Sequence, residues 1–535
     1  MTAPLWYKNA VFYEISVRAF KDSDGDGVGD LRGLTEKLDY LQTLGVDCIW
    51  IMPIYPSPRR DDGYDIADYY GVDPVYGSLD DLKTLIDATH QRGIRIIMDL
   101  VLNHTSDAHP WFQAARADRN SPYRDYYVWN DDDQKYAGVR IIFSDVEKSN
   151  WSWDEKAGQY FWHRFYSTQP DLNFDNPRVQ EEMLNVVRFW LEMGIDGFRV
   201  DAPTYLFERE GTNCESLPET HAYLKRIRRM IDSEFPGAIM LAESNQWPRE
   251  LIQYFDQGDE FHMAFNFPLM PRIFLALAQG QASSIKKILN DTPAIPANCQ
   301  WTTFLRNHDE LTLEMVTDEE RQLMWQEYAP EPQMILNLGI RRRLAPILNN
   351  DRRKIELVNS LLFSLPGSPI LYYGDEIGMG DNLNLPDRYG VRTPMQWDDS
   401  PYGGFTTGAP FTEPVQGEYG SQKGNVADQL KSPNSQLWAI RKMISLRKQY
   451  AAFGGSLEWV ETGNPAVLSY MREKDGESIL VLNNLSAVAQ SAHISTAYQK
   501  TGRDLFSNQS AAISEQLNLD PYSYHWIKLL PSATS

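Results

Sequence analysis

The sequence predicts an α/β protein built on a (β/α)8 TIM barrel, with an inserted subdomain and a C-terminal antiparallel β-sandwich domain. Apolar segments of strand length alternate with amphipathic segments of helix length through most of the chain. The alternation stops in one internal region, and near the C-terminus it gives way to short β-type segments separated by Gly, Asn and Asp. A chain of 535 residues is also too long for one compact core of ordinary size, which agrees with a protein of several domains.

The predicted barrel strands are apolar on both faces, as is typical of buried parallel strands. They are DCIWIMPI (47–54), RIIMDLV (95–101), GIDGFRVD (194–201), AIMLAES (238–244), TTFLRNHD (302–309) and SPILYYGDE (368–376). Two amphipathic segments between them have clear helix ends. One spans 79–93 and closes at Gly93, and the other spans 177–194, opens at Pro177 and closes at Gly194.

These patterns divide the chain into four consecutive parts. We expect residues 1–102 to form the first part of the barrel, 103–175 the inserted subdomain B, 176–448 the second part of the barrel and 449–535 the β-sandwich. The insertion contains aromatic-rich stretches without helical spacing. Because it follows a barrel strand, we expect it on the catalytic face.

The overall charge limits the ligand. Lys and Arg number 51 against 73 Asp and Glu, a net charge of −22, which repels nucleic acids and anionic membranes and favours a neutral or cationic small molecule. The three cysteines are far apart, so neither a disulfide framework nor a zinc site is indicated. The N-terminal stretch has no secretory-signal pattern and no apolar segment is long enough to span a bilayer, so a cytoplasmic enzyme is expected.

Four predicted strands end in polar residues: DLVLNH (99–104), GFRVD (197–201), LAES (241–244) and RNHDE (306–310). In a barrel these ends converge at the mouth where catalytic groups lie. Asp201, Glu243 and Asp309 would then form a set that cleaves glycosidic bonds, with one ionised carboxylate as nucleophile and one carboxylic acid as proton donor. Arg199, two residues before Asp201 on the same strand face, is expected to keep that Asp ionised.

The order of these motifs, together with YEISVRAF, QPDLNF and RTPMQW, resembles the α-amylase family of glycoside hydrolases over essentially the whole chain. The resemblance implies Asp201 as nucleophile, Glu243 as acid/base and Asp309 as transition-state stabiliser. It further implies a set of sugar-binding residues, which are His104, Arg199, His308, Tyr64 under the terminal glucose, Asp62 on its 4-hydroxyl and Arg392 closing the pocket. Such a pocket acts on terminal glucose.

Within the family the chain is most similar to the trehalose synthase group, whose members are maltose α-D-glucosyltransferases. The similarity lies in whole stretches such as PRRDDGYDIADYYGVDP and RNHDELTLEMVTDEER. It implies intramolecular transfer between maltose and trehalose through a covalent β-glucosyl intermediate on Asp201, with minor hydrolysis to glucose. An α-glucosidase or oligo-1,6-glucosidase uses the same groups and is the nearest alternative, and a non-catalytic α-glucosidase-like binding protein is a more distant one.

An isomerase of this kind must exclude water from the intermediate and retain the freed glucose. The segments 310–345 and 377–410 are the candidate lids. The resemblance also raises two protein partners, a second copy of the chain in a homo-oligomer and a maltokinase. No organic cofactor is expected.

Two structural cation sites are expected. The loop DSDGDGVGD resembles the start of a calcium-binding loop and offers Asp22, Asp24, Asp26, the Val28 carbonyl and Asp30, although Gly33 stands where a bidentate Glu is usual. The ion there would be Ca²⁺ or Mg²⁺. By resemblance to the family's calcium site, a second ion would be held by Asn103, Asp171, Glu208 and the carbonyls of Tyr205 and Leu206.

Overall fold

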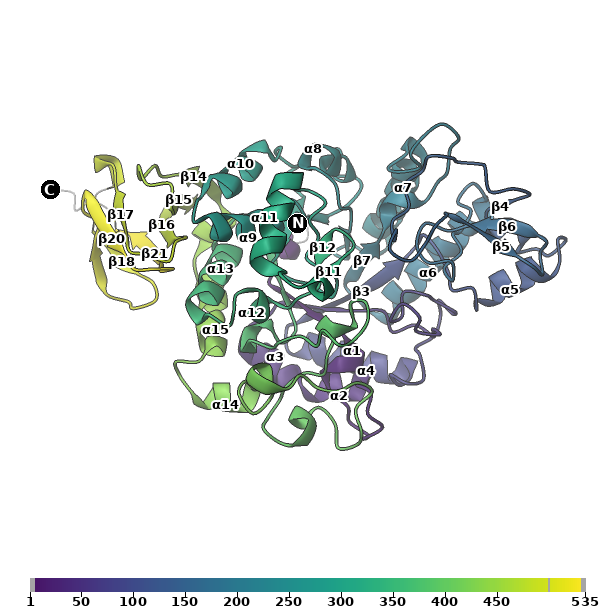
Figure 1. Ribbon diagram of the computed structural model, residues 1–535, viewed down its shortest axis with the longest axis horizontal. Coiled ribbons are helices and arrows are strands. Elements are labelled where there is room, and N and C mark those ends of the chain that lie inside the picture. Colours follow the sequence, from purple (N-terminus) through teal and green to yellow (C-terminus); the bar gives the residue numbers. More distant parts are fainter. Residues whose placement is uncertain (1–4, 499–500, 531–535) are drawn as a thin grey trace.

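Eight parallel strands close into a barrel at the centre of the computed structural model, which describes residues 5–498 and 501–530. In order around the barrel they are β1 (Phe12–Ile15), β2 (Cys48–Ile51), β3 (Arg95–Val101), β7 (Gly197–Asp201), β8 (Ile239–Ala242), β9 (Met263–Phe265), β10 (Gln300–Phe304) and β13 (Ser368–Tyr372). The fold class predicted from the sequence is confirmed. Figure 1 shows the barrel between two flanking parts of the molecule.

Helices follow most of the barrel strands, and one, α5 (Pro110–Ala117), lies in the part inserted after β3 (Figure 1). They are α1 (Val17–Phe20), α2 (Leu31–Glu36), α3 (Leu38–Leu44), α4 (Leu79–Gln91), α5 (Pro110–Ala117), α6 (Pro177–Met193), α7 (Pro218–Glu234), α8 (Pro248–Leu251), α9 (Leu269–Gln279), α10 (Ser283–Asp291), α11 (Asp318–Tyr328), α12 (Leu344–Ile347), α13 (Arg352–Ser364), α14 (Val426–Lys431) and α15 (Gln436–Gln449). Within the described residues, none of them is long and apolar enough to cross a membrane.

Local sequence explains where the two predicted helices begin and end. Ser78 and Asp81 form a reciprocal capping box at the start of α4. Asn176 caps α6, Pro177 occupies its first position, and Gly194 ends it in the left-handed conformation at φ 107°. Because Gly194 caps the helix, β7 begins only at Gly197, three residues after the predicted start.

Two barrel strands escaped the sequence pattern. β1 carries the buried polar residue Glu14 and spans four residues, and β9 spans three. Such short strands offer too few positions for an apolar run to be recognised. All six predicted strands are present. β3 has its predicted bounds, and the other five are shorter, because residues such as Asn307 and Asp309 lie in the loops beyond the strand ends.

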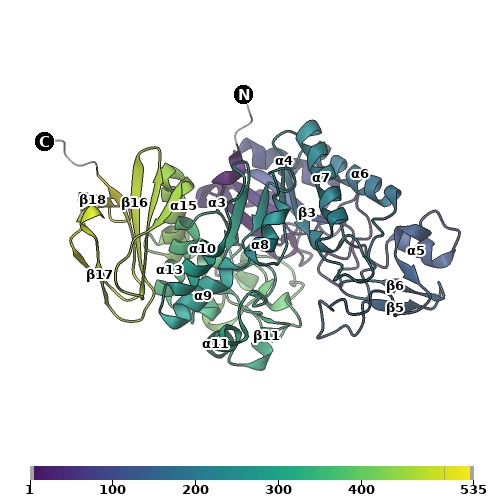
Figure 2. The ribbon, with the colours of Figure 1, turned by 90° about the horizontal axis from the view of Figure 1, so that it is seen from above.

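A small sheet extends from the barrel between β3 and α6. Strands β4 (Trp129–Asn130), β6 (Gln159–Trp162) and β5 (Trp151–Asp154) pair in that order, and all pairs are antiparallel. Figures 1 and 2 show this part, blue in both views, projecting on the side of the barrel opposite the C-terminal strands. It lies within the predicted subdomain B.

The C-terminal part is antiparallel. Six strands pair in the order β14 (Ser456–Trp459), β15 (Val467–Lys474), β16 (Glu477–Asn484), β21 (Tyr524–Leu529), β18 (Thr501–Asp504) and β19 (Ser510–Ala512), and β17 (Gln490–His493) pairs with β20 (Gln516–Leu519). A separate apolar core lies between the two sheets and includes Leu480, Ala492 and Leu519. A short hairpin, β11 (Ile335–Leu336) and β12 (Gly339–Ile340), belongs to the barrel's 310–345 segment.

Candidate active site

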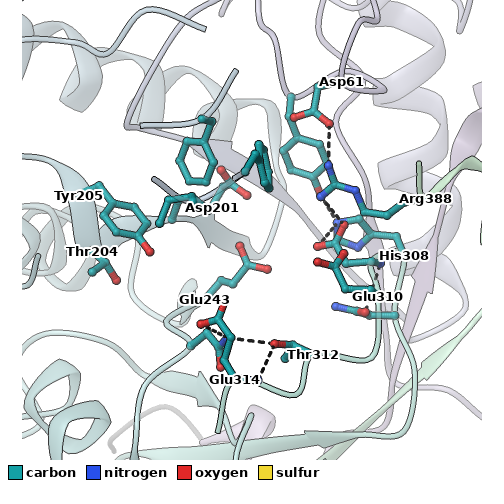
Figure 3. Close-up of a pocket in the computed structure, with 18 of the residues that line it drawn as sticks. Asp61, Asp201, Thr204, Tyr205, Glu243, His308, Glu310, Thr312, Glu314 and Arg388 are labelled. Atoms are coloured by element: carbon teal, nitrogen blue, oxygen red, sulfur yellow. Dashed lines mark hydrogen bonds and ion pairs between the residues drawn. The ribbon is translucent and has the colours of Figure 1, made fainter. Parts of the chain in front are cut away.

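A cavity lies at the carboxyl ends of the barrel strands, where the three predicted catalytic carboxylates meet (Figure 3). Asp201 is the last residue of β7, Glu243 directly follows β8, and Asp309 lies five residues beyond β10. Seven of the nine predicted catalytic and sugar-binding residues line this cavity, namely Tyr64, His104, Asp201, Glu243, His308, Asp309 and Arg392. Arg199 and Asp62 lie behind its wall.

Arg199 connects the carboxylates from beneath the cavity. It is 1% exposed; its Nη1 lies 2.8 Å from Asp201 Oδ1 and 2.5 Å from Asp99 Oδ1, and its Nη2 pairs with Glu243. Asp99 also accepts from the Trp50 indole at 2.8 Å. One buried guanidinium therefore fixes the two candidate reacting groups relative to each other.

Asp201 and Glu243 differ in protonation. Burial raises the pKa of Asp201 to about 6 while Arg199 opposes the rise. Burial raises the pKa of Glu243 further, to about 8, and the adjacent Asp201 and Asp309 charges add to the effect. The interaction between the two carboxyl groups lowers the pKa of Asp201 and raises that of Glu243, as expected when Glu243 is the protonated partner. At neutral pH the pair is thus one carboxylate and one carboxylic acid.

The separation of the pair indicates stereochemistry. An inverting pair stands about 6.5–9.5 Å apart to admit a water, whereas a retaining pair is closer. One guanidinium, that of Arg199, pairs with both Asp201 and Glu243 and so holds the two carboxyl groups close together. The arrangement suits attack on the anomeric carbon by Asp201 itself.

Asp309 stays ionised because two guanidinium groups hold it. Its Oδ1 accepts from Arg388 Nη1 at 3.1 Å and from Arg392 Nη2 at 3.0 Å. Burial would raise the pKa of Asp309, but the adjacent His308 and these arginines together outweigh burial and hold the pKa well below its usual range. The third carboxylate therefore carries its charge at every pH at which the pair above can react.

His308 and Tyr64 form one wall. Their rings stack with an interplanar angle of 12°, and the Tyr64 hydroxyl lies 2.9 Å from His308 Nε2. Burial lowers the pKa of His308 well below its ordinary value and that of His104 to about 3, so both rings are neutral. A neutral imidazole can donate a hydrogen bond to a sugar hydroxyl or accept one from it.

The structure corrects the predicted role of Asp62. Its Oδ1 lies 2.9 Å from Arg18 and its Oδ2 3.2 Å from Arg392, so both oxygens are engaged by guanidinium groups, and Asp62 itself does not line the cavity. Asp61 lines the cavity instead, and its Oδ2 accepts from Gln169 at 2.9 Å. The backbone at Asp62 is left-handed, φ 49°, which turns consecutive side chains to different sides. Asp61 is the carboxylate available to a sugar hydroxyl.

Three parts of the chain surround the cavity mouth. Subdomain B contributes Arg140, Ile142, Phe143 and Phe165, the predicted lid 310–345 contributes Glu310, Thr312 and Glu314, and the predicted lid 377–410 contributes Arg388 and Arg392. Glu314 accepts from Asn245 Nδ2 at 3.1 Å and lies 3.6 Å from Arg140. Tyr166 donates to Asp387 at 3.0 Å. The mouth is therefore bridged on both sides.

Arg341 ties the two lid segments together. Its guanidinium donates to the carbonyls of Gln333, Leu383, Leu385 and Asp387 at 2.6 to 3.1 Å. The next residue, Arg342, pairs with Asp381 at 2.9 Å. Because the loop held in this way carries Arg388, the position of that arginine depends on the 310–345 segment.

Sequence reasoning missed several cavity residues. Asp61 could have been found because the motif offers two adjacent acids. Arg388 could have been found because it lies only four residues before Arg392, which was predicted to close the pocket. Phe143 and Phe165 had no signal because subdomain B shows no regular period. Tyr205, predicted only for its carbonyl, places its side chain on the cavity, as Figure 3 shows.

Three of the residues predicted to hold the second cation do come together. Asn103 interacts with Asp171 and lowers its pKa, and the charge of Asp171 raises the pKa of Glu208. All three side chains are at most 6% exposed. One oxygen of each has no hydrogen-bond partner: Asn103 Oδ1, Asp171 Oδ2 and Glu208 Oε1. Burial raises the pKa of Asp171 to about 8 and that of Glu208 well above its usual range. Converging buried oxygen atoms without donors fit a hard cation.

The acidic loop is only partly assembled. Asp22, Asp24 and Asp30 offer oxygens within 4.8 Å of one another, whereas Asp26 stands apart from this group and accepts from the Val28 amide. Asp22 already accepts from Gly25, Gly27 and Thr406, so its oxygens are satisfied within the protein.

Comparisons with known proteins agree with this architecture. The model "Alpha amylase, catalytic domain" matches residues 14–455 and "Maltogenic Amylase, C-terminal domain" matches 457–526. The chain is 54% identical over 545 residues to the trehalose synthase/amylase TreS of Mycobacterium tuberculosis, covering 98% of this chain and 90% of that protein. It is 55% identical over 508 residues to the trehalose synthase of Pimelobacter sp., covering 91% and 88%.

A solved structure shows the same fold. Trehalulose synthase MutB from Pseudomonas mesoacidophila MX-45 matches with a TM-score of 0.81 at 29% identity, covering 99% of this chain and 100% of that one. A parallel barrel with three carboxylates in a cavity at the strand ends defines an enzyme of the glycoside hydrolase class. The chain belongs to the α-amylase family.

Proposed function

We propose that this enzyme interconverts maltose and trehalose by intramolecular glucosyl transfer. The observation that carries the proposal is a pocket in which one guanidinium holds a carboxylate and a carboxylic acid together, with a mouth bridged by contacts from three parts of the chain. Relatives named trehalose synthase at 54% and 55% identity support the choice of substrates.

In the first step Asp201 attacks the anomeric carbon of the non-reducing glucose of maltose. The bond from that carbon to the 4-oxygen of the second glucose breaks, and Glu243 gives its proton to this oxygen. The product is a β-glucosyl ester on Asp201 and a free glucose. Asp309, fixed by Arg388 and Arg392, lies close enough to stabilise positive charge on the sugar ring.

In the second step the freed glucose presents its anomeric hydroxyl to the same carbon. Glu243 takes the hydroxyl proton, the new bond forms and the ester bond to Asp201 breaks. The two inversions retain the α configuration at the transferred glucose, and attack by the α-anomeric hydroxyl of the freed glucose gives the α,α-1,1 linkage of trehalose. All atoms of maltose are conserved, and both carboxyl groups return to their starting states.

The nearest competing function is hydrolysis by an α-glucosidase, in which water replaces glucose in the second step. Trapping of the glucose would distinguish the two, and it depends on the bridged mouth rather than on the reacting groups. A name that includes amylase for one close relative supports a small hydrolytic side reaction here as well. A non-catalytic role is disfavoured because all three carboxylates occupy the cavity.

We further propose that Ca²⁺ stabilises the junction of the barrel with subdomain B. Asn103, Asp171 and Glu208 would supply oxygen ligands through the atoms that lack donors. The ion would fix the loop after β3, which also carries His104. The chemical steps above use only side chains of the pocket.

Product analysis tests the proposal. Purified enzyme is incubated with maltose, and anomeric proton signals are followed by NMR. From maltose we expect trehalose as the main product and glucose as a minor one, and from trehalose the same mixture of disaccharides should be approached. Asp201→Asn should show no turnover. Glucose as the sole product would contradict the isomerase assignment and leave an α-glucosidase.

A further inference from the structure

A buried carboxyl group that the mechanism does not use lies behind the cavity. Glu14, in the middle of β1, is fully buried, and its Oε1 lies 2.5 Å from Nδ1 of His308 and 3.2 Å from the His308 backbone nitrogen. The Glu14 carboxyl group therefore contacts, from outside the cavity, a ring that lines the cavity. Its second oxygen, Oε2, has no hydrogen-bond partner.

The other nitrogen of His308 faces the reacting groups. Nε2 lies 2.9 Å from the Tyr64 hydroxyl and 3.4 Å from Asp309 Oδ2. Asp309 is ionised, and its two arginine partners contact Oδ1, so Oδ2 is the oxygen that needs a donor. The Tyr64 oxygen also receives a weak hydrogen bond from Arg199 at 3.4 Å. These neighbours favour a proton on Nε2.

The protonation of Glu14 follows from this arrangement. In a neutral imidazole only one nitrogen carries a proton. If that nitrogen is Nε2, Nδ1 is an acceptor, and an oxygen 2.5 Å from it must be the donor. A neutral carboxyl group also tolerates the unpaired Oε2 better than a carboxylate would.

We infer that Glu14 is a positioning residue that stays protonated and donates to His308 Nδ1, so that His308 presents a permanent Nε2 hydrogen-bond donor to Asp309 and to the substrate. Burial raises the pKa of Glu14 well above its usual range and lowers that of His308, which agrees with a neutral pair. Arg199 is the nearest opposing charge on Glu14, and it is already engaged by three other carboxylates. A wrong tautomer of an active-site histidine is known to reduce turnover strongly even when the geometry is preserved.

The inference deepens the proposed glucosyl transfer and rests on it, but it can be tested separately. Glu14→Gln keeps a donor to Nδ1, because the Gln amide nitrogen can donate to Nδ1 as the protonated acid does, and it gives up only the 3.2 Å hydrogen bond that Oε1 accepts from the His308 backbone. Glu14→Ala removes the donor and frees the ring. We expect total maltose consumption, counted whether trehalose or glucose forms, to stay within about threefold in Glu14→Gln and to fall about 10- to 100-fold in kcat/KM in Glu14→Ala.

Glu376 provides a matched control. It is also fully buried, and its Oε1 accepts from Tyr13 at 2.7 Å and from Tyr40 at 2.5 Å, but it does not line the cavity. Glu376→Ala should lower the Tm as Glu14→Ala does while leaving kcat and KM close to the wild-type values. A drop confined to Tm in both variants would show that Glu14 is merely structural and overturn the inference.

NMR of the resting enzyme reads the tautomer directly. With ¹⁵N-labelled histidine, the His308 signals are identified by their loss in His308→Asn. We expect Nε2 at the frequency of a protonated ring nitrogen and Nδ1 at that of an unprotonated one, unchanged in Glu14→Gln. A protonated Nδ1 in the wild type, together with Glu14→Gln as inactive as Glu14→Ala, would establish an ionised Glu14 and refute the inference whatever product the enzyme makes.

Discussion

Arg199 Nη1 lies 2.8 Å from Oδ1 of Asp201, and the same guanidinium pairs with Glu243 through its other nitrogen. One cation therefore serves both members of the reacting pair, yet their pKa values differ. Burial raises both pKa values and Arg199 opposes both rises, but the interaction between the two carboxyl groups lowers the pKa of Asp201 and raises that of Glu243. Environment thus assigns the nucleophile and the acid.

This difference predicts a bell-shaped pH dependence. Asp201 with a pKa of about 6 must be ionised, so the rate should fall as the pH drops below that value. Glu243 with a pKa of about 8 must be protonated, so the rate should fall above it. Because Asp201 and Glu243 interact, the two apparent pKa values of the pH profile belong to the pair rather than to either residue alone. Initial rates of maltose consumption at saturating and at low substrate check this, and a rate that rises steadily through about pH 9 would contradict the assignment.

Glu243→Gln should remove the alkaline limb along with most of the activity. General acid catalysis contributes about 10²- to 10⁴-fold, and a Gln can neither give nor take the proton. Substrates with a good leaving group, such as an aryl α-glucoside, need less protonation and should regain a larger share of the rate in the first step. An equal loss on maltose and on the aryl glucoside would place Glu243 outside the acid role.

Asp61 and Asp62 should behave differently although they are neighbours. Asp61→Asn weakens a charge-assisted hydrogen bond to a sugar hydroxyl, worth about 1.5–3 kcal/mol, so KM should rise about tenfold or more with little change in Tm. Asp62→Asn removes one of the two carboxylates that pair with the buried Arg392, and also the partner of Arg18, so the free energy of unfolding should fall by up to about 3 kcal/mol. Steady-state kinetics and thermal melts distinguish them. The opposite pattern would restore Asp62 as the sugar ligand.

Arg341→Met should make the enzyme more hydrolytic. The change removes donors to three carbonyls of the loop that holds Arg388, so the mouth opens more often and water reaches the glucosyl ester. We expect the ratio of glucose to trehalose to rise several-fold. Arg353→Met is the matched control because Arg353 is 62% exposed and pairs only with Asp351.

Chemical rescue separates a local effect from misfolding. Free guanidinium added to Arg341→Ala should restore part of the wild-type product ratio, since it can occupy the vacated position. Unchanged product ratios in all Arg341 variants would mean that the two lid segments close the pocket independently.

Calcium should stabilise the fold. After dialysis against EGTA, added Ca²⁺ should raise the Tm by an amount that grows with the logarithm of its concentration. Glu208→Gln should remove most of this rise, because Glu208 supplies one of the oxygens that lack donors. The exposed Glu219→Gln is the matched control and should keep it. A rise that survives in Glu208→Gln would place the ion elsewhere, for example at the Asp22 loop.

The barrel was predictable because its long strands are apolar on both faces and its helices carry clear caps. The catalytic carboxylates were predictable for a related reason: strand ends in a barrel converge, so residues distant in sequence could be grouped. β1 was missed because one of its four residues is Glu14, and a buried polar residue breaks an apolar run.

The other features of the site could not be predicted because they depend on the conformation of loops. Which of two adjacent acids faces the sugar depends on a single left-handed residue, Asp62, whose φ no pattern reveals. The contacts of Arg341 with backbone carbonyls carry no sequence signature either, because any residue offers a carbonyl. Sequence therefore predicted which carboxyl groups meet at the strand ends, and the structure was needed for what encloses them.

The central claim is that glucose stays in the closed pocket between the two steps. The most direct test is to incubate the enzyme with maltose and an excess of ¹³C-labelled free glucose and to resolve the disaccharides by NMR. We predict trehalose that carries almost no label, with little glucose released, because the freed sugar does not leave before it reacts again. Trehalose that acquires label as fast as it forms would contradict the claim, since it would show that glucose exchanges freely with the solution.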